Sequence, residues 1–185
     1  MPFTVQDFRS KLSRGGARQN LFEVILPFPA VSGGASKTEQ FSFMCKAASL
    51  PPEEIGVIPV PYFGRQIKVP GDRTFPEWSV TVINDEAFDL RDVFEQWSNA
   101  INGHFNNLRN PAALFANVGG GASGYATTAT VIQYGKTGDV LKEYDMVGMW
   151  PSAVTPQDLA WDANDQIEEF QVTWQYQWWE ARTTV

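Results

Sequence analysis

Hydrophobic and polar residues alternate along the C-terminal part of the chain. Between residues 168 and 179 the apolar positions are Phe170, Val172, Trp174, Tyr176 and Trp178. The polar positions between them are Glu169, Gln171, Thr173, Gln175 and Gln177. A period of two residues is that of a β-strand, so the pattern predicts one strand of about a dozen residues, roughly 40 Å long. One face of this strand is apolar, and the other is polar with a single charge.

Shorter apolar or alternating runs predict further strands upstream. They are residues 21–26, 41–47, 78–83, 127–134 and 140–149. The Pro-, Gly- and Ser-rich residues 27–40 predict a hairpin loop between the first two runs. Residues 135–138 are bounded by Gly and predict a tight hairpin turn between the last two. We therefore expect a mainly β, mostly antiparallel protein.

One helix is expected in the middle of the chain. Its apolar residues recur at helical spacing and are Leu90, Val93, Phe94, Trp97 and Ile101. Asn84 and Asp85 precede them and are residue types that cap helix N-termini. The polar side of this helix carries Asp89, Arg91, Asp92 and Glu95. We expect the apolar side to cover one face of the sheet and the polar side to face outward.

Residues 48–70 combine prolines with exposed-type apolar positions. The prolines are Pro51, Pro52, Pro59, Pro61 and Pro70, and the large apolar residues are Ile55, Val57, Ile58, Val60, Tyr62 and Phe63. Proline cannot donate to a β-ladder, so this stretch is predicted to be an edge or an extended arm. Its apolar side chains need a cover, which is either another molecule or the arm's own domain.

The chain length of 185 residues predicts a single domain spanning residues 1–185. Residues 1–19 are interpreted as an N-terminal arm, 48–70 as the extended arm, and 104–125 as an inserted flexible loop rich in Gly.

The formal net charge of −7 argues against a protein that grips nucleic acid through its phosphates. One Cys and one His exclude a disulfide framework, a Cys/His zinc site and a Cys–His nucleophile pair within the chain. No apolar run approaches ~18 residues, and no signal-like segment follows the basic start, so we expect no membrane insertion by this chain.

Motifs that suggest chemistry are incomplete. Gly119-x-Gly121-x-x-Gly124 is followed by a strand-like rather than a helix-like sequence, which a dinucleotide site requires. Asp162-x-Asn164-x-Gln166 lacks the glycine and the closing Glu of a calcium loop. The paired carboxylates are adjacent in sequence, and adjacent strand residues point to opposite faces. We expect no enzyme activity, no catalytic residues, no cofactor and no metal.

Four features occur in order along the chain. They are Phe43-x-Cys45-Lys46-Ala47, then Gly71-Asp72-Arg73-Thr74-Phe75-x-x-Trp78-x-Val80-Thr81-Val82-x-Asn84-Asp85-Glu86, then Trp150-Pro151, and the alternating ending 167–180. In this order and spacing they resemble the tail tube protein family of contractile-tailed (myovirus-type) bacteriophages over about residues 20–180. The second feature is the most specific.

The resemblance implies an antiparallel β-sandwich or barrel-like subunit with one outer α-helix, contributing strands to a shared multi-subunit β-barrel tube. It implies hexameric rings stacked into the inner tail tube of the virion, a conduit for genome ejection that is assembled in the host cytoplasm. The implied partners are further copies of the chain, the tail sheath protein, and the baseplate, tape-measure and tail-terminator proteins. The resemblance also implies that DNA passes through the tube in transit without specific binding.

The residues fit this expectation. A barrel with an aqueous channel takes about sixteen strands or more, so several copies must share one wall. The candidate lumen-facing residues are Glu169, Gln171, Thr173, Gln175 and Gln177. The resemblance implies that the arm carrying Ile55, Val57, Ile58, Val60, Tyr62 and Phe63 reaches the adjacent ring, and that the helix face with Asp89, Arg91, Asp92 and Glu95 lies near the sheath.

Two alternatives stay open at this point. One is a tube subunit of a phage-like injection or secretion machine that carries effectors. The other is a carbohydrate-binding β-sandwich in which Trp178, Trp179 or Tyr125 stacks on sugars.

Overall fold

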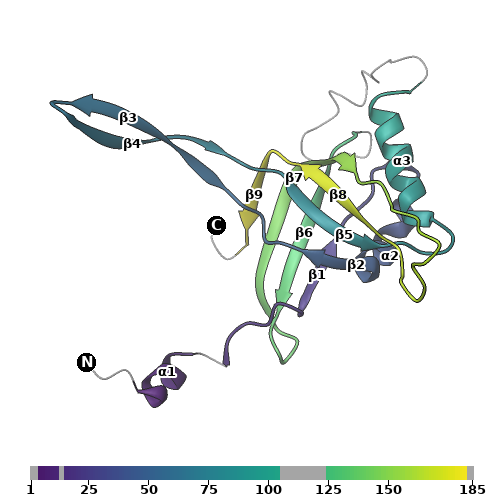
Figure 1. The fold of residues 1–185 in the computed structure, drawn as a ribbon, viewed down its shortest axis with the longest axis horizontal. Coiled ribbons are helices and arrows are strands. Elements are labelled where there is room, and N and C mark those ends of the chain that lie inside the picture. The colour runs from purple at the N-terminus through teal and green to yellow at the C-terminus, as the bar shows by residue number, and fades with distance from the viewer. Residues whose placement is uncertain (1–3, 13–14, 105–123, 183–185) are drawn as a thin grey trace.

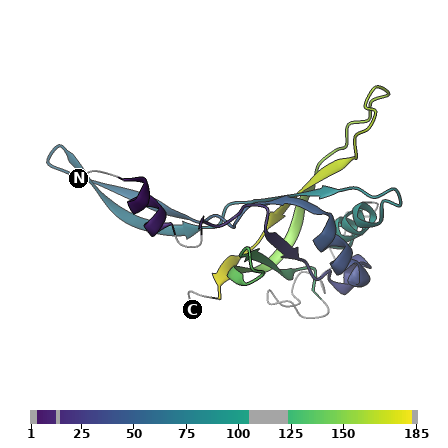
Figure 2. The same ribbon diagram turned by 90° about the horizontal axis from the view of Figure 1, so that it is seen from below.

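The computed structural model describes residues 4–12, 15–104 and 124–182. Figure 1 shows a β-rich body with α3 on one side of it, and two extensions on the other: the hairpin of β3 and β4, and the N-terminal segment with α1. Figure 2 shows the same body from below, with a loop between β7 and β8 projecting in a third direction.

The described residues form nine strands and three α-helices. The strands are β1 (Phe22–Ile25), β2 (Cys45–Ala48), β3 (Glu54–Tyr62), β4 (Arg65–Thr74), β5 (Trp78–Ile83), β6 (Thr127–Tyr134), β7 (Val140–Val154), β8 (Glu169–Gln175) and β9 (Trp178–Ala181). The helices are α1 (Val5–Lys11), α2 (Thr38–Met44) and α3 (Asp89–Ile101), with two short 3₁₀ turns, Ala30–Ser32 and Ala35–Lys37.

The body is built from two sheet layers that share one long strand. All the pairings are antiparallel, in the order β1-β6-β7-β8-β5-β2, with β9 beside β7. The first part of β7 pairs with β6 and β9, and its last residues, Trp150–Val154, pair with β8. Gly148 lies between these two parts with a φ of +70°. The predicted mainly antiparallel β-fold is confirmed, and β7 turns the corner between the layers.

Aromatic side chains fill the space between the sheets and α3. Phe94 and Trp97 of α3 each lie 5.6 Å, centroid to centroid, from the ring of Trp174 on β8. Phe28 and Phe41 complete the cluster from the segment after β1 and from α2. The apolar side of the predicted helix is therefore buried as expected, because Leu90, Val93, Phe94 and Trp97 all belong to the core.

The start of α3 differs from the prediction. The helix begins at Asp89, after Phe88, which has a φ of +57° and makes no side-chain cap. Asn84 is instead bonded to Glu168, the residue directly before β8. Its backbone N–H donates to the Glu168 carbonyl at 2.8 Å, and its amide Nδ2 donates to the Glu168 carboxylate at 3.1 Å. Asn84 and Asp85 close the turn after β5 and do not cap the helix.

The single long C-terminal strand was a wrong prediction. The chain forms β8, leaves the ladder at Tyr176 and Gln177, and resumes as β9. The reason is the bend of β7, because β8 pairs with the part of β7 after Gly148 and β9 with the part before it. One straight strand cannot follow a partner through that corner.

The predicted hairpin of residues 21–26 and 41–47 was also wrong. Residues 38–44 form helix α2, and only Cys45–Ala48 is a strand. β1 pairs with β6 and β2 pairs with β5, so the two do not form a hairpin. Phe41 and Cys45 are both buried and stand four residues apart, which is helical spacing, whereas Phe43 is exposed. Strands 78–83 and 127–134 are confirmed at the predicted bounds, and 140–149 extends to Val154.

The segment 48–70 lies mostly in the hairpin of β3 and β4, a separate two-stranded sheet that extends to Thr74. In both views it projects away from the body (Figures 1 and 2). The interpretation of residues 104–125 as an inserted loop falls almost entirely outside the described residues. Within the described residues, no helix is long and apolar enough to cross a membrane.

Candidate functional site

The outer face of the sheet β7-β8-β5-β2 is polar. Its residues are placed by register: Thr173 stands opposite Ser79, and Gln171 stands opposite Thr81. Their neighbours along β8, namely Phe170, Val172 and Trp174, point the other way and are buried. We call the surface made by Glu169, Gln171, Thr173, Gln175, Ser79 and Thr81 the polar sheet face.

The few charges at the edges of the polar sheet face are bonded to neighbours. Lys46 Nζ from β2 donates to the Glu169 carboxylate. Gln175 Nε2 donates to Glu77 Oε1 at 2.7 Å. The face therefore presents amide and hydroxyl groups with no excess positive charge. Gln177 lies in the break between β8 and β9, where its backbone N–H donates to the Val147 carbonyl at 2.9 Å, so it does not continue this row.

The hairpin of β3 and β4 has one apolar face that is exposed to solvent. Cross-strand partners share a face, so the register places Ile58 with Val69 and Val60 with Ile67 on one side, next to Tyr62. These five side chains are 42–62% exposed. A two-stranded ribbon is marginally stable in water by itself, and an uncovered apolar face calls for a partner surface.

The hairpin ends in an unusual tip. Tyr62 pairs with Arg65, which leaves Phe63 and Gly64 as a two-residue turn with φ of +42° and +78°. Such turns favour Asn-Gly, because a bulky residue is strained at positive φ. Phe63 is 91% exposed, and its ring contacts Tyr62 edge-on at 4.6 Å between centroids.

The polar side of α3 is only partly free. Asp89 forms an ion pair with Lys37, with 2.6 Å between Asp89 Oδ2 and Lys37 Nζ. Arg91 donates to Glu95 at 3.0 Å and to the Thr155 carbonyl at 3.3 Å, and it lies over the Phe170 ring. Asp92 is exposed, as is Glu95 apart from its pair with Arg91. Of the four predicted outer residues, Asp89 and Arg91 thus fasten the helix to its own subunit.

The loop between β7 and β8, residues 155–168, was missed as a surface of interest. Leu159, Trp161 and Ile167 are 71–104% exposed on it. It also carries four acids and no base: Asp158, Asp162, Asp165 and Glu168. From the sequence, this stretch was interpreted only as an incomplete calcium loop. The signal that could have identified it is a tryptophan among four acids. We call residues 155–168 the acidic loop.

Helix α1 was not predicted either, and it carries a stripe of exposed apolar residues. Val5, Phe8 and Leu12 are 42–76% exposed and stand three and four residues apart. This spacing places them on one side of the helix, where the described residues leave them uncovered.

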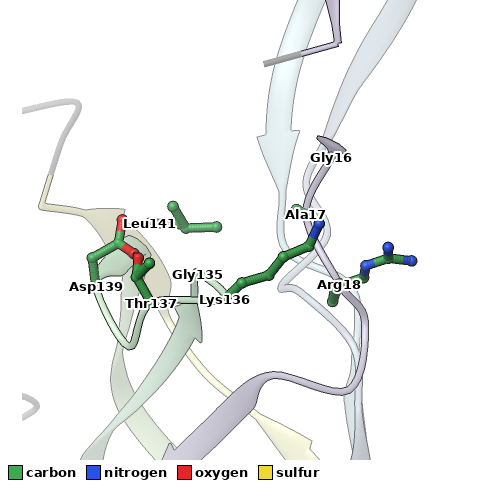
Figure 3. A pocket seen from close by; sticks show the side chains of 8 residues that line it. All are labelled: Gly16, Ala17, Arg18, Gly135, Lys136, Thr137, Asp139 and Leu141. Carbon is green, nitrogen blue, oxygen red and sulfur yellow. The ribbon is translucent and has the colours of Figure 1, made fainter. Parts of the chain in front are cut away.

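A cleft of about 520 Å³ separates the segment after α1 from the β6–β7 turn. Figure 3 shows the Lys136 side chain reaching from the turn toward Gly16 and Ala17, with Thr137 and Asp139 on the far side. Thr137 donates to Asp139. This arrangement is suited to holding the N-terminal segment against the body.

Among the described residues, no group of three or more His, Cys, Asp or Glu side chains is placed to hold a metal. Burial raises the pKa of the Cys45 thiol to about 12 and that of the Tyr176 hydroxyl to about 12. Three aromatic residues were suggested for sugar stacking. Trp178 is 39% exposed and donates to the Glu180 carboxylate, and the other two pack within the subunit. Tyr125 packs on Trp150, and Trp179 packs on Tyr144 and donates to the Pro52 carbonyl.

Comparison with known proteins shows what the chain is similar to in sequence. The sequence profile of the family described as "Phage tail tube protein" matches residues 17–182. The tail tube protein gp19 of Enterobacteria phage T4 is 38% identical over 165 residues, which covers 89% of this chain and 91% of that protein. The tail tube protein of Serratia phage KSP90 is 30% identical over 172 residues, covering 90% of each chain.

Solved structures show the same fold at low identity. The tube-terminating cap of the anti-feeding prophage aligns with a TM-score of 0.61 at 16% identity, covering 90% of this chain and 91% of that one. A chain of the sheath–tube complex of an extracellular contractile injection system, PVC, aligns with a TM-score of 0.53 at 14% identity, covering 98% and 99%.

Proposed function

Because the chain belongs to the phage tail tube protein family, it is a structural protein of the virion's contractile tail, and we propose that six copies close into a ring around a shared β-cylinder. The rings stack into the inner tube of the tail, through which the genome passes into the host. The observation that carries the proposal is the polar sheet face, which is exposed along the layer β7-β8-β5-β2 and ends in open edges.

The open edges are the sites where neighbouring copies add strands. Within the described residues, β2 pairs with β5 alone, and β7 beyond Met149 pairs with β8 alone. Unpaired edge strands are templates for another chain. Each copy supplies the four strands between these edges, so six copies supply about 24, well beyond the sixteen or so that leave an aqueous channel.

The width of such a cylinder follows from strand spacing. At about 4.8 Å per strand, 24 strands make a wall about 115 Å around, or about 37 Å across before strand tilt widens it. A layer of side chains about 5 Å deep on each side leaves a bore of about 27 Å. A duplex fits within it.

The chemistry of the polar sheet face suits passage. Duplex DNA carries one negative charge per ≈ 1.7 Å, and a basic lining would condense onto it and hold it. Glu169, Gln171, Thr173 and Gln175 offer polar contact, with the one nearby lysine, Lys46, already bonded to Glu169. In this arrangement the lining lets the polyanion slide.

The extensions account for the remaining contacts. The hairpin, which carries Ile55, Val57, Ile58, Val60, Tyr62 and Phe63, packs against the adjacent ring. The exposed acids Asp92 and Glu95 on α3 face the sheath. The baseplate, tape-measure and tail-terminator proteins meet the ends and the interior of the finished tube, and assembly takes place in the host cytoplasm.

A second candidate shares the architecture. The likeness to tube components of contractile injection systems covers nearly the whole fold and is compatible with a tube that carries effectors instead of a genome. Family membership favours the phage tail, and the content of the particle discriminates between the two. No catalytic role is part of the proposal.

Electron microscopy of the purified protein tests the proposal. We expect six-membered rings and hollow tubes whose wall is one continuous β-cylinder with Gln171 and Thr173 facing the bore. A protein that stays monomeric at high concentration, or a tube whose bore is lined by another surface, would overturn it.

A further inference from the structure

The exposed tip of the hairpin is chemically complementary to the acidic loop. Between Ile55 and Pro70 the hairpin carries two charges, both positive, on Arg65 and Lys68. Between Thr155 and Glu168 the acidic loop carries four, all negative. Each element also displays large apolar residues: Tyr62 and Phe63 on the tip, and Leu159, Trp161 and Ile167 on the loop.

Neither set of charges is neutralised inside the subunit. Arg65 and Lys68 form no ion pair among the residues that the structure describes, and the same holds for Asp158, Asp162 and Asp165 there. Glu168 alone is bonded, as acceptor from the Asn84 amide. Three acids of the loop are therefore free to meet bases from another molecule.

The shape of the acidic loop also suits an inserted tip. A groove of about 550 Å³ runs along it, and its lining includes Pro156, Leu159, Trp161, Ile167 and the acids Asp158, Glu168 and Glu169. Trp161 on its rim is fully exposed, and tryptophan is the ring that binds cations best through its face. The groove offers apolar side chains to the two aromatic rings of the tip. The unpaired acids Asp162 and Asp165 lie on the same loop and offer partners to the two cations.

The tip is built at a conformational cost. Phe63 occupies the first position of a turn at a φ of +42°, where Asn or Gly would be relaxed. Such a backbone conformation is strained for a residue with a bulky side chain, and observed strain is grounds for a functional hypothesis. A residue that neither relaxes the turn nor packs into the body is explained by a contact with another molecule.

We propose that the hairpin tip of one copy inserts into the acidic loop of a second copy in the adjacent ring, with Phe63 beside Trp161 and Arg65 and Lys68 against Asp162 and Asp165. This inference rests on the proposed tube function and names the receiving surface. The two elements project from different sides of the body (Figures 1 and 2), so the contact is head-to-tail. Head-to-tail contacts that do not close propagate without limit, as a stack of rings requires.

A charge swap tests the pairing. Arg65→Glu with Lys68→Glu brings like charges together, and we expect the critical protein concentration for tube growth to rise about tenfold or more. Asp162→Lys with Asp165→Lys should do the same. The chain carrying all four changes should return to near the wild-type value. The matched controls are Arg9→Glu on α1 and Asp92→Lys on α3, which change charge away from both elements.

Turn chemistry and cross-linking give independent readouts. Phe63→Asn relaxes the turn, so it should leave the monomer at least as stable and still raise the critical concentration. In a Cys45→Ala background, Phe63→Cys with Trp161→Cys should yield a ladder of disulfide-linked oligomers on oxidation, whereas Phe63→Cys with Asp92→Cys should not.

The outcomes separate the two proposals. Tubes that grow equally well with either reversed charge set, or a fourfold variant that shows both losses added together, overturn the pairing and leave the tube function standing. The same holds if reversal on the acidic loop abolishes only attachment of the sheath. A wild-type chain that forms neither rings nor tubes overturns both.

Discussion

Uncharged side chains decide how the polar sheet face acts on a polyanion. Gln171 lies in the middle of β8, opposite Thr81, and is exposed. In the proposed six-membered ring, Gln171→Arg would place six guanidinium groups around one level of the bore. We expect intact tubes, because the position is solvent-exposed, and at least a tenfold loss of infectivity, because each ring would gain charge-assisted contacts to phosphate.

The control for this change is Gln96→Arg on α3, which adds the same charge on an exposed helix position away from the sheet. It should leave genome ejection at the wild-type rate. Measuring DNA release from triggered particles separates passage from assembly. Normal release from Gln171→Arg particles would remove this residue from the channel lining.

The buried environment of Cys45 leads to a prediction about the reactivity of its thiol. Burial raises the pKa of its thiol to about 12, so the reactive thiolate is absent from the folded protein at pH 8. We expect iodoacetamide to leave the native chain unmodified and to alkylate it after unfolding in urea. Alkylation of the native chain at the rate of the unfolded chain would contradict the burial.

The same raised pKa affects stability at alkaline pH. The unfolded thiol loses its proton above about 9, while the folded thiol keeps it until about 12, so the free energy of unfolding falls as pH rises through this window. Tyr176, also raised to about 12, adds to the fall from about pH 10. Cys45→Ala should flatten the slope between pH 9 and 10 in urea titrations.

At the scale of single residues, the sequence predicted the faces of β8 well. Phe170, Val172 and Trp174 are buried as the alternation predicts, because one face of β8 packs on the hydrophobic core along its whole length. The prediction of one continuous strand fails at Gln177. The cause is the bend of the partner strand β7 at Gly148, some thirty residues earlier in the chain. No local pattern carries that information.

At the scale of elements, Gly148 makes the corner of β7 possible. Its φ of +70° is accessible to glycine and strained for residues with a Cβ. We expect Gly148→Ala to lower the free energy of unfolding by about 1–2 kcal/mol. Gly148→Asn should cost less, because Asn tolerates this region. Urea denaturation below the assembly concentration measures both, and equal stability of all three proteins would place the bend elsewhere.

The helices show which elements the sequence could and could not predict. α3 was identified because its apolar residues recur over three turns, whereas α2 spans only Thr38–Met44. A short apolar run such as Phe41 to Met44 fits a strand or a helix equally well by periodicity. Contacts decide between them: Ser42 Oγ donates to the Val24 carbonyl at 2.8 Å, and Phe41 packs edge-on to Phe28 and Phe94.

At the scale of the whole molecule, strand order was beyond the sequence pattern. β5 lies between β2 and β8, which are separated from each other by more than a hundred residues. Pairings of that range depend on how the whole core packs. The composition is consistent with the proposed assembly, because aromatic residues make up 14% of the chain and several large ones, among them Phe63 and Trp161, are exposed. Surplus aromatic surface is typical of a subunit whose burial is completed by its neighbours.

The closed ring and the stacked tube depend on different surfaces, and that separation gives a whole-molecule prediction. In the proposed assembly, ring closure uses the edges β2 and β7, whereas stacking uses the hairpin, which contributes no residue to the buried core. Replacing residues 55–73 by a short Gly-Ser turn should therefore leave the subunit folded and the ring intact while tube growth stops.

Native mass spectrometry checks this directly. The full-length ring should weigh about 124 kDa, six times 20.7 kDa, and the shortened variant should stop at six times its own mass. Six is the expected number because four strands per copy must close a cylinder wide enough for a duplex. Fewer copies narrow the cylinder in proportion, and the bore more steeply, because the side-chain layer keeps its depth. A shortened variant that still forms long tubes would show that stacking depends on the sheet edges, and one that stays monomeric would show that the hairpin also closes the ring.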